Sequence, residues 1–318
     1  MKSKYIAWAI APIFLIGCSD YLETPPSVDY GENEVFATRA DAEKLLTTLY
    51  AEGMPYGFCM SSTNTDRRLL SSSTLASACD EGEDVATWAM GNAAWNAGNH
   101  TNTNFPWDED CRFYLRNHTM RVANLILKRI HEVPFDEGDP DFNKRTTGEA
   151  YFMRAMLLWE GVYRYGGMPI VRDVIDPTDF SQRPRNSFSD CIDSILIDCD
   201  RATQYLPDYY TDNAKLGRAT RIAALALKAR VLLYAASPLF NTSTPYMSFP
   251  GHEDLIGYGN YDRERWKKAA DAAKAAIDAA LASGHYKIHN TGNPDKDYED
   301  VWTIPDNEEI ILGNMKYR

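Results

Sequence analysis

The sequence predicts a mainly α-helical fold, made of degenerate tetratricopeptide-like helix pairs with long loops. Apolar residues recur in several segments at the i, i+3, i+4, i+7 spacing of one helix face. Glycine or proline residues follow these segments at the points where a helix would end. Small residues on the last two segments favour the close approach of paired helices.

Six predicted helices follow one another along the chain. Their approximate bounds are Thr38–Tyr50, Phe113–Val133, Asn143–Tyr165, Phe188–Tyr205, Ala219–Ala236 and Tyr261–Ser283. Thr38 has the side chain of an N-cap. Stop signals follow the last four helices, at Gly166-Gly167, Pro207, Pro238 and Gly284. The segment Met54–Trp107 has no sustained period, and a loop of this length is typically functional or disordered.

The last two helices show how the chain is expected to pack. Ala219–Ala236 is apolar almost all round, which predicts burial between other helices. The small residues are Ala223, Ala226 and Ala229, followed by Ala269, Ala273, Ala276 and Ala280. Helix starts near residues 143, 188, 219 and 261 give two pairs about 75 residues apart, a looser spacing than a regular 34-residue repeat.

The last residues of the chain predict a β-strand. Glu308–Leu312 reads as a strand, and no partner strand follows it before Arg318. We therefore expect this chain to be a fragment whose C-terminal part is missing.

The first 17 residues have the order of a secretory signal, with two lysines followed by an apolar run. Leu15-Ile16-Gly17-Cys18 looks like a bacterial lipobox, which predicts cleavage before Cys18 and lipidation of its thiol. The alternative is a chance cysteine beside an ordinary signal. The apolar run is shorter than the roughly 20 residues of a membrane span, so we expect attachment through the lipid anchor only.

This N-terminal pattern divides the chain into three parts. Residues 1–17 are the predicted signal peptide, and residues 18–34 are the lipidated N-terminus with an acidic, turn-rich tether. Residues 35–318 form the predicted helical domain, which we expect to be truncated.

Composition excludes several function classes. A net charge of −12 and a pI near 5.0 argue against nucleic acid and anionic lipid as partners, because both require a basic face. G-x-S-x-G, H-E-x-x-H, P-loop and G-x-G-x-x-G motifs are absent, and no pair of carboxylates stands out as a glycosidase site. We therefore predict that the chain is not an enzyme and needs no cofactor.

Metal binding is not predicted either. The segment from Asp139 to Ala150 begins like an EF-hand calcium loop, but Lys144 stands where glycine is needed and Ala150 where the closing glutamate should be. His285 and His289 have a ligand-like spacing without a third ligand nearby. The cysteines other than Cys18 have no CxxC spacing and are predicted mostly as buried small hydrophobes: Cys59, Cys79, Cys111, Cys191 and Cys199.

Four strings along the chain form a recognisable set. They are CSDYLETPP at Cys18–Pro26, RVAN at Arg121–Asn124, GEAYFMRAMLLWEGVYRYGGMPIV at Gly148–Val171 and GRATRIAALALKARVLLYAASPLFN at Gly217–Asn241. In this order they resemble the SusD/RagB family, surface lipoproteins of Bacteroidota that capture nutrients, usually glycans, for a TonB-dependent transporter. The resemblance implies a scaffold of tetratricopeptide-like pairs and a longer chain. It also implies a lipid-anchored protein on the outer membrane, facing the cell exterior, with a SusC-like TonB-dependent transporter and an oligosaccharide or polysaccharide as partners.

The strongest of these motifs is predicted to be structural. In Gly148–Val171 the apolar residues Phe152, Trp159 and Tyr163 fall on helical spacing, and the following glycines permit a tight exit. An exposed i, i+4 pair between Glu160 and Arg164 in this helix would contribute only about 0.3–0.5 kcal/mol.

The segment from Asp80 to Trp107 is the predicted ligand-binding loop, because it combines tryptophans with asparagines. Sugars present apolar faces and a hydroxyl rim, so a glycan site needs aromatic platforms with amides or carboxylates at their edges. The predicted site residues are Asp80, Trp88, Trp95, Asn96 and Asn99. The resemblance implies that glycan binders of the family place such residues after an acidic stretch like Ala78–Glu81. The alternative is that the tryptophans only anchor a long loop to the core.

Other readings stay open. The loop Asn241–Asn260 offers Tyr246, Phe249, His252 and Tyr258 as a second aromatic candidate. A peptide or glycoprotein binder on the same scaffold, or a structural adaptor for the transporter, would fit the same sequence.

Overall fold

The computed structural model describes residues 31–54, 101, 113–176 and 178–313. Within these ranges the chain forms eight α-helices and no β-strand. The helices are α1 Glu32–Val35, α2 Arg39–Gly53, α3 Phe113–Arg129, α4 Phe142–Tyr165, α5 Phe188–Tyr205, α6 Arg221–Ala236, α7 Glu264–Ala282 and α8 Pro294–Thr303. The prediction of a mainly α-helical protein is confirmed, and the six predicted helices match α2 to α7 within a few residues at each end.

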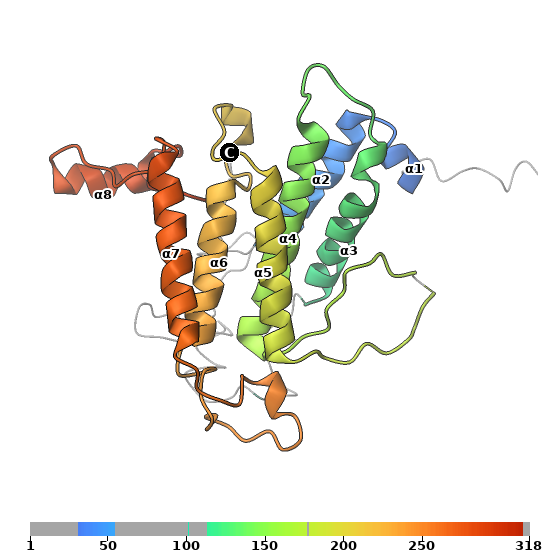
Figure 1. The fold of residues 1–318 in the computed structure, drawn as a ribbon. Coiled ribbons are helices and arrows are strands. Elements are labelled where there is room, and N and C mark those ends of the chain that lie inside the picture. The colour runs from blue at the N-terminus through green and yellow to red at the C-terminus, as the bar shows by residue number, and fades with distance from the viewer. Residues whose placement is uncertain (1–30, 55–100, 102–112, 177, 314–318) are drawn as a thin grey trace, which may run out of the picture.

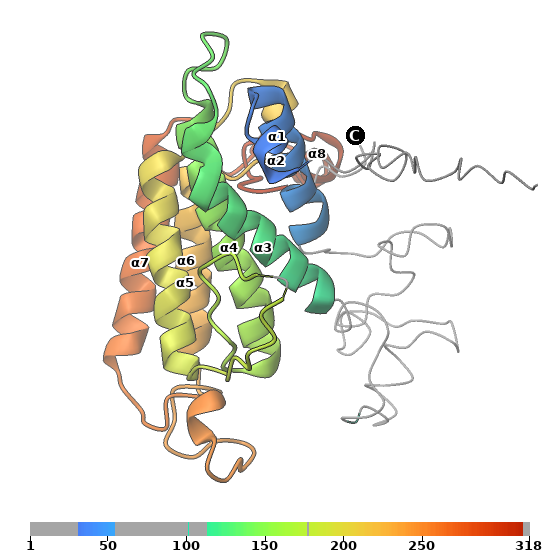
Figure 2. The ribbon, with the colours of Figure 1, turned by 90° about the vertical axis from the view of Figure 1, so that its right-hand side faces the viewer.

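The helices form a row in which sequence neighbours lie side by side. Helices α4, α5, α6 and α7 run up and down in turn, and α4–α5 and α6–α7 are the two most extensive pairings (Figure 1). Figure 2 shows α2 and α3 on the side of α4 away from α7. This is the expected tetratricopeptide-like arrangement of helix pairs.

Short polar side chains begin three of these helices. Thr38, Ser187 and Thr220 each accept a hydrogen bond from the backbone N–H three residues further on, at 3.2, 3.0 and 3.1 Å. Such caps satisfy backbone donors that the helix itself leaves without a partner. The predicted N-cap at Thr38 is therefore confirmed.

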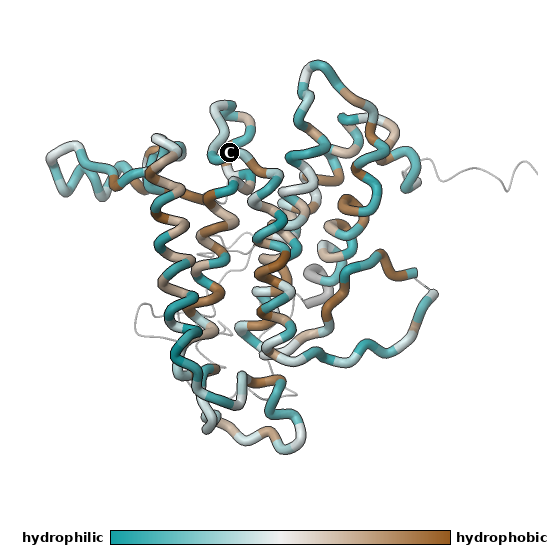
Figure 3. The backbone as a smooth tube through the Cα atoms, in the orientation of Figure 1, coloured by the Kyte–Doolittle hydropathy of each residue, from teal (hydrophilic) through white to brown (hydrophobic). Residues whose placement is uncertain are grey.

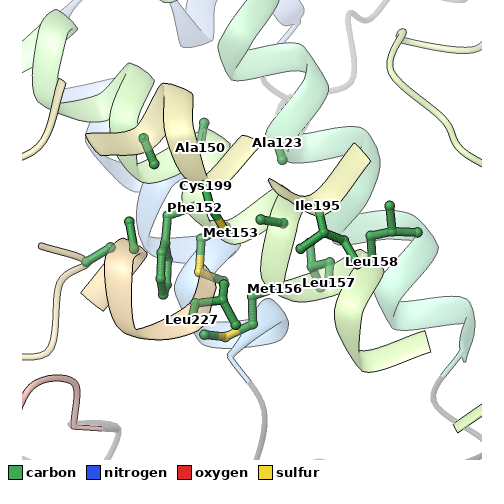
Figure 4. Packing of buried hydrophobic residues seen from close by; sticks show 14 of the residues in the cluster. Ala123, Ala150, Phe152, Met153, Met156, Leu157, Leu158, Ile195, Cys199 and Leu227 are labelled. Atoms are coloured by element: carbon green, nitrogen blue, oxygen red, sulfur yellow. The ribbon is translucent and has the colours of Figure 1, made fainter. Parts of the chain in front are cut away.

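The core lies where α4 packs against its neighbours. Phe152 and Met153 of α4 are fully buried, together with Ile195 and Cys199 of α5 (Figure 4). Figure 3 shows hydrophobic residues along these inner helices, whereas α8 is largely hydrophilic. Since α2, α3 and α5 all pack on α4, the interpretation of Gly148–Val171 as a core segment is confirmed.

The exit of α4 requires its two glycines. Gly166 has φ +77, and a Cβ there would lie 2.1 Å from the carbonyl oxygen of Leu255. A Cβ on Gly167 would lie 2.1 Å from the carbonyl oxygen of Asn186. Only residues without a side chain let the chain pass between these backbones.

The charged residues of α4 differ from the expectation. Glu160 and Arg164 do pair, at 2.6 Å, but their side chains are 10% and 8% exposed, so the predicted exposed pair is in fact buried. Arg154, facing α3 and α5, donates to Asp198 at 2.8 and 2.7 Å and to Asn124 at 2.9 Å. Helices on several sides of α4 leave these charges little access to water, so other side chains must pair with them.

The C-terminal segment corrects one prediction and adds a helix. Glu308–Leu312 is not a strand but a series of turns, and Ile310 N–H donates to Asn307 O at 2.9 Å. An apolar run forms a strand only when another strand accepts its backbone hydrogen bonds, and the described residues supply none. Helix α8, which was not predicted, begins after Asn293, whose side chain accepts from the N–H groups of Asp295 and Lys296.

The outer helices are less enclosed than predicted. Helix α6 packs between α5 and α7, yet Leu233 remains 55% exposed. On α7 only Ala269 is buried, with Ala273, Ala276 and Ala280 partly covered. Among the described residues, no helix is long and apolar enough to cross a membrane.

Candidate functional site

The predicted site residues lie outside the described ranges. They are Asp80, Trp88, Trp95, Asn96 and Asn99 in the predicted loop, together with the predicted lipidation site Cys18. Their assignment stays a prediction. Cys191 and Cys199 are described, and both are buried free thiols, as expected.

The second aromatic loop, Asn241–Asn260, divides into a structural and an exposed part. The ring of Tyr258 packs edge-on against Phe188 at 5.2 Å, and the guanidinium of Arg265 lies 3.7 Å from its centroid. Burial raises the pKa of Tyr258 to about 12. Tyr246 is 82% exposed. Tyr258 therefore packs against the core. Tyr246 and Phe249, which is 39% exposed, remain as accessible aromatic residues of this loop.

A cleft of about 300 Å³ opens where α5 ends and α4 begins. Tyr205, Tyr209 and Tyr210 line it, and Leu206 and Pro207 add apolar surface. Its polar lining residues come from both sides of the cleft: Asp141, Lys144, Arg145, Gln204, Thr211, Asp212 and Lys215. The cleft thus combines aromatic rings with hydrogen-bonding groups, and sequence reasoning did not find it. The only signal for it is the cluster of tyrosines in QYLPDYY at Gln204–Tyr210.

Contacts with other parts of the chain fix the three tyrosine rings. Tyr209 stacks parallel on His285 at a centroid distance of 4.7 Å and an interplanar angle of 4°. Tyr205 stacks on Tyr151 at 6.1 Å. The hydroxyl of Tyr210 donates to the carbonyl oxygen of Ala219 at 3.2 Å. The aromatic walls of the cleft are therefore held in place by residues outside it.

The loop that carries these tyrosines is itself anchored. Asp208 forms an ion pair with Arg221 at the start of α6, and the N–H of Arg221 donates to Pro207 O at 2.7 Å. Asp212 accepts from the N–H of Ala214 at 2.9 Å. The connection between α5 and α6, at the top of Figure 1, thus has a defined shape.

A cluster of charges adjoins the cleft, and two of its members, Arg145 and Lys215, also line it. Arg145 donates to both carboxylate oxygens of Asp139, at 2.9 and 2.7 Å, and Lys215 lies 3.5 Å from the same carboxylate. The hydrogen bonds from Arg145 are the main reason that the pKa of Asp139 falls to about 2. Asp139 thus serves the fold by pairing with both cations.

The same cluster continues into the core at Glu149, which is 0% exposed. Arg218 lies 3.3 Å from Glu149 and 2.9 Å from Glu43, so it joins α4 to α2. Arg145 lies 3.5 Å from Glu149 on the other side. Burial is the largest influence on this carboxyl and raises the pKa of Glu149. These pairs keep the base of the cleft rigid by linking three segments of the chain.

The two C-terminal histidines have structural partners. His285 stacks on Tyr209, and His289 lies 3.0 Å from Asp300 and 3.1 Å from Glu308. The two carboxylates contact different ring nitrogens of His289 and so do not converge with it on one point. Across the described parts of the chain, no group of three His, Cys, Asp or Glu residues could hold a metal ion.

Comparison with known proteins places the chain in a family. Residues 20–233 match the SusD-like family described as "starch-binding associating with outer membrane". The chain belongs to the SusD-like family. Over 230 residues it is 25% identical to SusD-like protein P2 of Formosa agariphila, covering 71% of this chain and 42% of that protein. The family resemblance inferred from the four strings is confirmed.

Solved structures of SusD-like proteins have the same fold. A SusD-like protein from Bacteroides fragilis is 25% identical with a TM-score of 0.58, covering 89% of this chain and 45% of that one. A laminarin-binding SusD-like protein is 19% identical with a TM-score of 0.61, covering 87% and 51%. This SusD-like chain therefore spans about half the length of these relatives.

Proposed function

We propose that this chain is part of a lipid-anchored protein on the outer face of the outer membrane, which binds a glycan and passes it to a TonB-dependent transporter. The match of residues 20–233 to a starch-binding, outer-membrane-associated family carries the proposal. The laminarin-binding protein of the same fold adds support, because it shows a glycan ligand on this scaffold. The chain covers only part of the length of its relatives. Its ligand and its partner are therefore proposed from family membership.

The loop around Trp88 and Trp95 is the proposed main contact with the glycan. Its tryptophans would stack on sugar faces, and Asp80, Asn96 and Asn99 would hydrogen-bond the hydroxyl rim. The structure describes residues on both sides of this segment, at the end of α2 and the start of α3. Binding is proposed without catalysis, since the sequence carries no enzyme motif.

Affinity electrophoresis tests glycan binding. The purified protein is run through gels containing laminarin, starch or other polysaccharides, beside Trp88→Ala and Trp95→Ala. We expect retardation by at least one glycan and weaker retardation of both variants. Trp302→Ala is the matched control, because Trp302 is 66% exposed on α8 and lies outside the loop. Unchanged mobility of both loop variants would remove the loop from the site.

Two other outcomes would replace the proposal. Binding to peptides but to no glycan would favour a peptide or glycoprotein receptor on the same scaffold. Recovery of the transporter in a pull-down while every ligand screen stays blank would favour a structural adaptor.

The membrane anchor has its own test. Cys18→Ser removes the thiol that would carry the lipid, so this variant should leave the membrane fraction and take up no labelled fatty acid. Cys191→Ser is the control, because the Cys191 thiol is buried in the helical core. Equal membrane retention of both variants would contradict lipidation at Cys18.

A further inference from the structure

The cleft between α4 and α5 has the features of a saccharide site apart from the predicted loop. Tyr209 forms one of its walls and is 37% exposed, although the segment that carries it is anchored on both sides. The stack on His285 covers one face of the ring. Tyr209 nevertheless lines the cleft with more than a third of its surface exposed, so part of the ring is accessible to a ligand without rearrangement.

Rigidity matters because binding orders side chains at a cost. An immobilised side chain typically loses about 0.5–1.5 kcal/mol in free energy when a ligand fixes it. Tyr205 and Tyr209 are already held by stacking, and Tyr210 by its hydrogen bond to Ala219 O. Folding has therefore already ordered these three side chains, so ligand binding loses little further conformational entropy from them.

The polar groups of the cleft match a ligand rich in hydroxyls. Gln204 and Thr211 can both donate and accept, Lys144 donates, and Asp212 accepts. A hydroxyl group likewise donates one hydrogen bond and accepts others, so neighbouring hydroxyls can use this mixed set. The volume of about 300 Å³ lies at the small end of ligand sites, which suits one or two sugar units of a longer chain.

The charges of the cleft favour an uncharged ligand. Arg145 and Lys215 both pair with the carboxylate of Asp139, at 2.7 and 3.5 Å. Asp212 also lies 3.9 Å from Lys215, and Lys144 and Asp141 supply one charge of each sign among the remaining lining residues. An acidic sugar would meet no concentrated positive charge. One common mode of peptide binding, the addition of a strand to a sheet edge, has no counterpart here because the described residues contain no sheet.

We propose that this cleft, with Tyr209 as its stacking platform, binds a neutral sugar unit of the same glycan as a second subsite. The proposal rests on the proposed glycan-binding function. It adds a second binding position, formed by described residues, and specifies that the sugar bound there is neutral. Its residues come from the start of α4, the end of α5 and the connection between α5 and α6, so it is separate in sequence from the loop around Trp88 and Trp95.

Isothermal titration with laminarin and with soluble starch tests the subsite. Tyr209→Ala should weaken binding of the retained glycan about five- to tenfold, in keeping with the worth of one aromatic stacking contact. Tyr209→Phe keeps the ring and should bind within about twofold of the unsubstituted protein. Tyr298→Ala is the control, because Tyr298 is 72% exposed on α8 and does not line the cleft.

Hydrogen exchange of the unsubstituted protein gives a second measurement that does not depend on how the variants fold. Saturating glycan should slow exchange in residues 204–216 and leave α8 unchanged. Protection there together with a selective loss in Tyr209→Ala supports the subsite.

Three results overturn the proposal, and they are distinguishable. Glycan binding with equal affinity for Tyr209→Ala and Tyr298→Ala, and without protection of residues 204–216, removes the subsite but leaves the proposed function intact. No binding to any glycan by the unsubstituted protein overturns both. Tighter binding of alginate, an acidic polysaccharide, or of a peptide than of laminarin and starch, if it is lost in Tyr209→Ala, would show that the cleft does not bind a neutral sugar.

Discussion

Arg154 of α4 and Lys274 of α7 each pair with a carboxylate, but in opposite surroundings. Arg154 is 5% exposed and uses three hydrogen bonds to Asp198 and Asn124. Lys274 reaches Asp278 at 2.7 Å with a side chain that is 75% exposed. Helix α4 has neighbours on several sides, whereas among the described helices α7 packs mainly on α6. The same kind of pair is therefore a structural requirement in one helix and a minor contact in the other.

The largest expected effect comes from breaking the inner pair. Arg154→Leu would leave Asp198 buried, with Arg172 at 3.2 Å as its remaining charged partner among the described residues. Removing one member of a buried pair costs about 3–5 kcal/mol, so the free energy of unfolding should fall by roughly that amount. Urea unfolding followed by circular dichroism measures it. Lys274→Leu is the matched control and should change stability by less than about 1 kcal/mol. Similar losses in the two variants would contradict the contrast.

Two isoleucines sharpen the same comparison for apolar side chains. Ile195 of α5 is 0% exposed, and Ile277 of α7 is 59% exposed. Ile195→Ala should destabilise the fold by about 2–5 kcal/mol, because it removes buried surface and leaves a cavity. Ile277→Ala should change the unfolding midpoint little, since most of that side chain contacts water. A large loss from Ile277→Ala would show that something further covers α7.

Two glycines test how tightly α4 is enclosed along its length. A Cβ on Gly148 would lie 2.8 Å from side-chain atoms of Leu206 and Tyr205, whereas one on Gly161 would first meet the flexible Met168 at 3.4 Å. Gly148→Ala should destabilise by about 1–3 kcal/mol through overpacking. Gly161→Ala should be neutral or stabilising by up to about 1 kcal/mol, because alanine favours the helix. Thermal melts of the two variants should therefore shift differently, and an equal shift would disprove the difference in packing.

The smallest effect on stability is expected around His289, in the segment between α7 and α8. Hydrogen bonds with Asp300 and Glu308 raise the pKa of His289, and the same contacts help to lower the pKa of both carboxyls. The histidine's contribution to stability is full below its ordinary pKa of about 6.5 and is lost as pH rises through the raised value. The carboxylates' contribution is present above their ordinary pKa values and is lost as pH falls through the lowered ones. Stability from this cluster should therefore be greatest between about pH 5 and 6.5.

Comparison of the protein with His289→Gln isolates this dependence. The difference in melting temperature between the two should narrow as pH rises from 6 to 9. A difference that is constant over this range would show that His289 does not act through its charge.

Much of the helical fold could be predicted from local pattern. Helix α5 has its predicted bounds, and Pro207 follows its end as the sequence indicates. Ser187 caps its start in the structure. Helix α8 was missed because it is short, acidic and nearly without buried residues. The sequence wrongly predicts a strand at Glu308–Leu312, because a short apolar run has the same pattern whether or not a partner strand exists.

The cleft could not be predicted in the same way. Its tyrosines are close in sequence, but the residues that fix two of them, Tyr151 and His285, come from α4 and from the segment after α7. The loop around Trp88 was predicted from composition alone, and it stays a prediction.

The sequence by itself determined the helices, their caps and the family, because these depend on residues a few positions apart or on short matching strings. The tertiary structure decided which charges are buried and where a ligand could fit. Arg218 meets Glu43 across 175 positions of the chain, and Arg154 meets Asp198 across 44. No local pattern encodes such pairs, since only folding brings their elements together and excludes water from them.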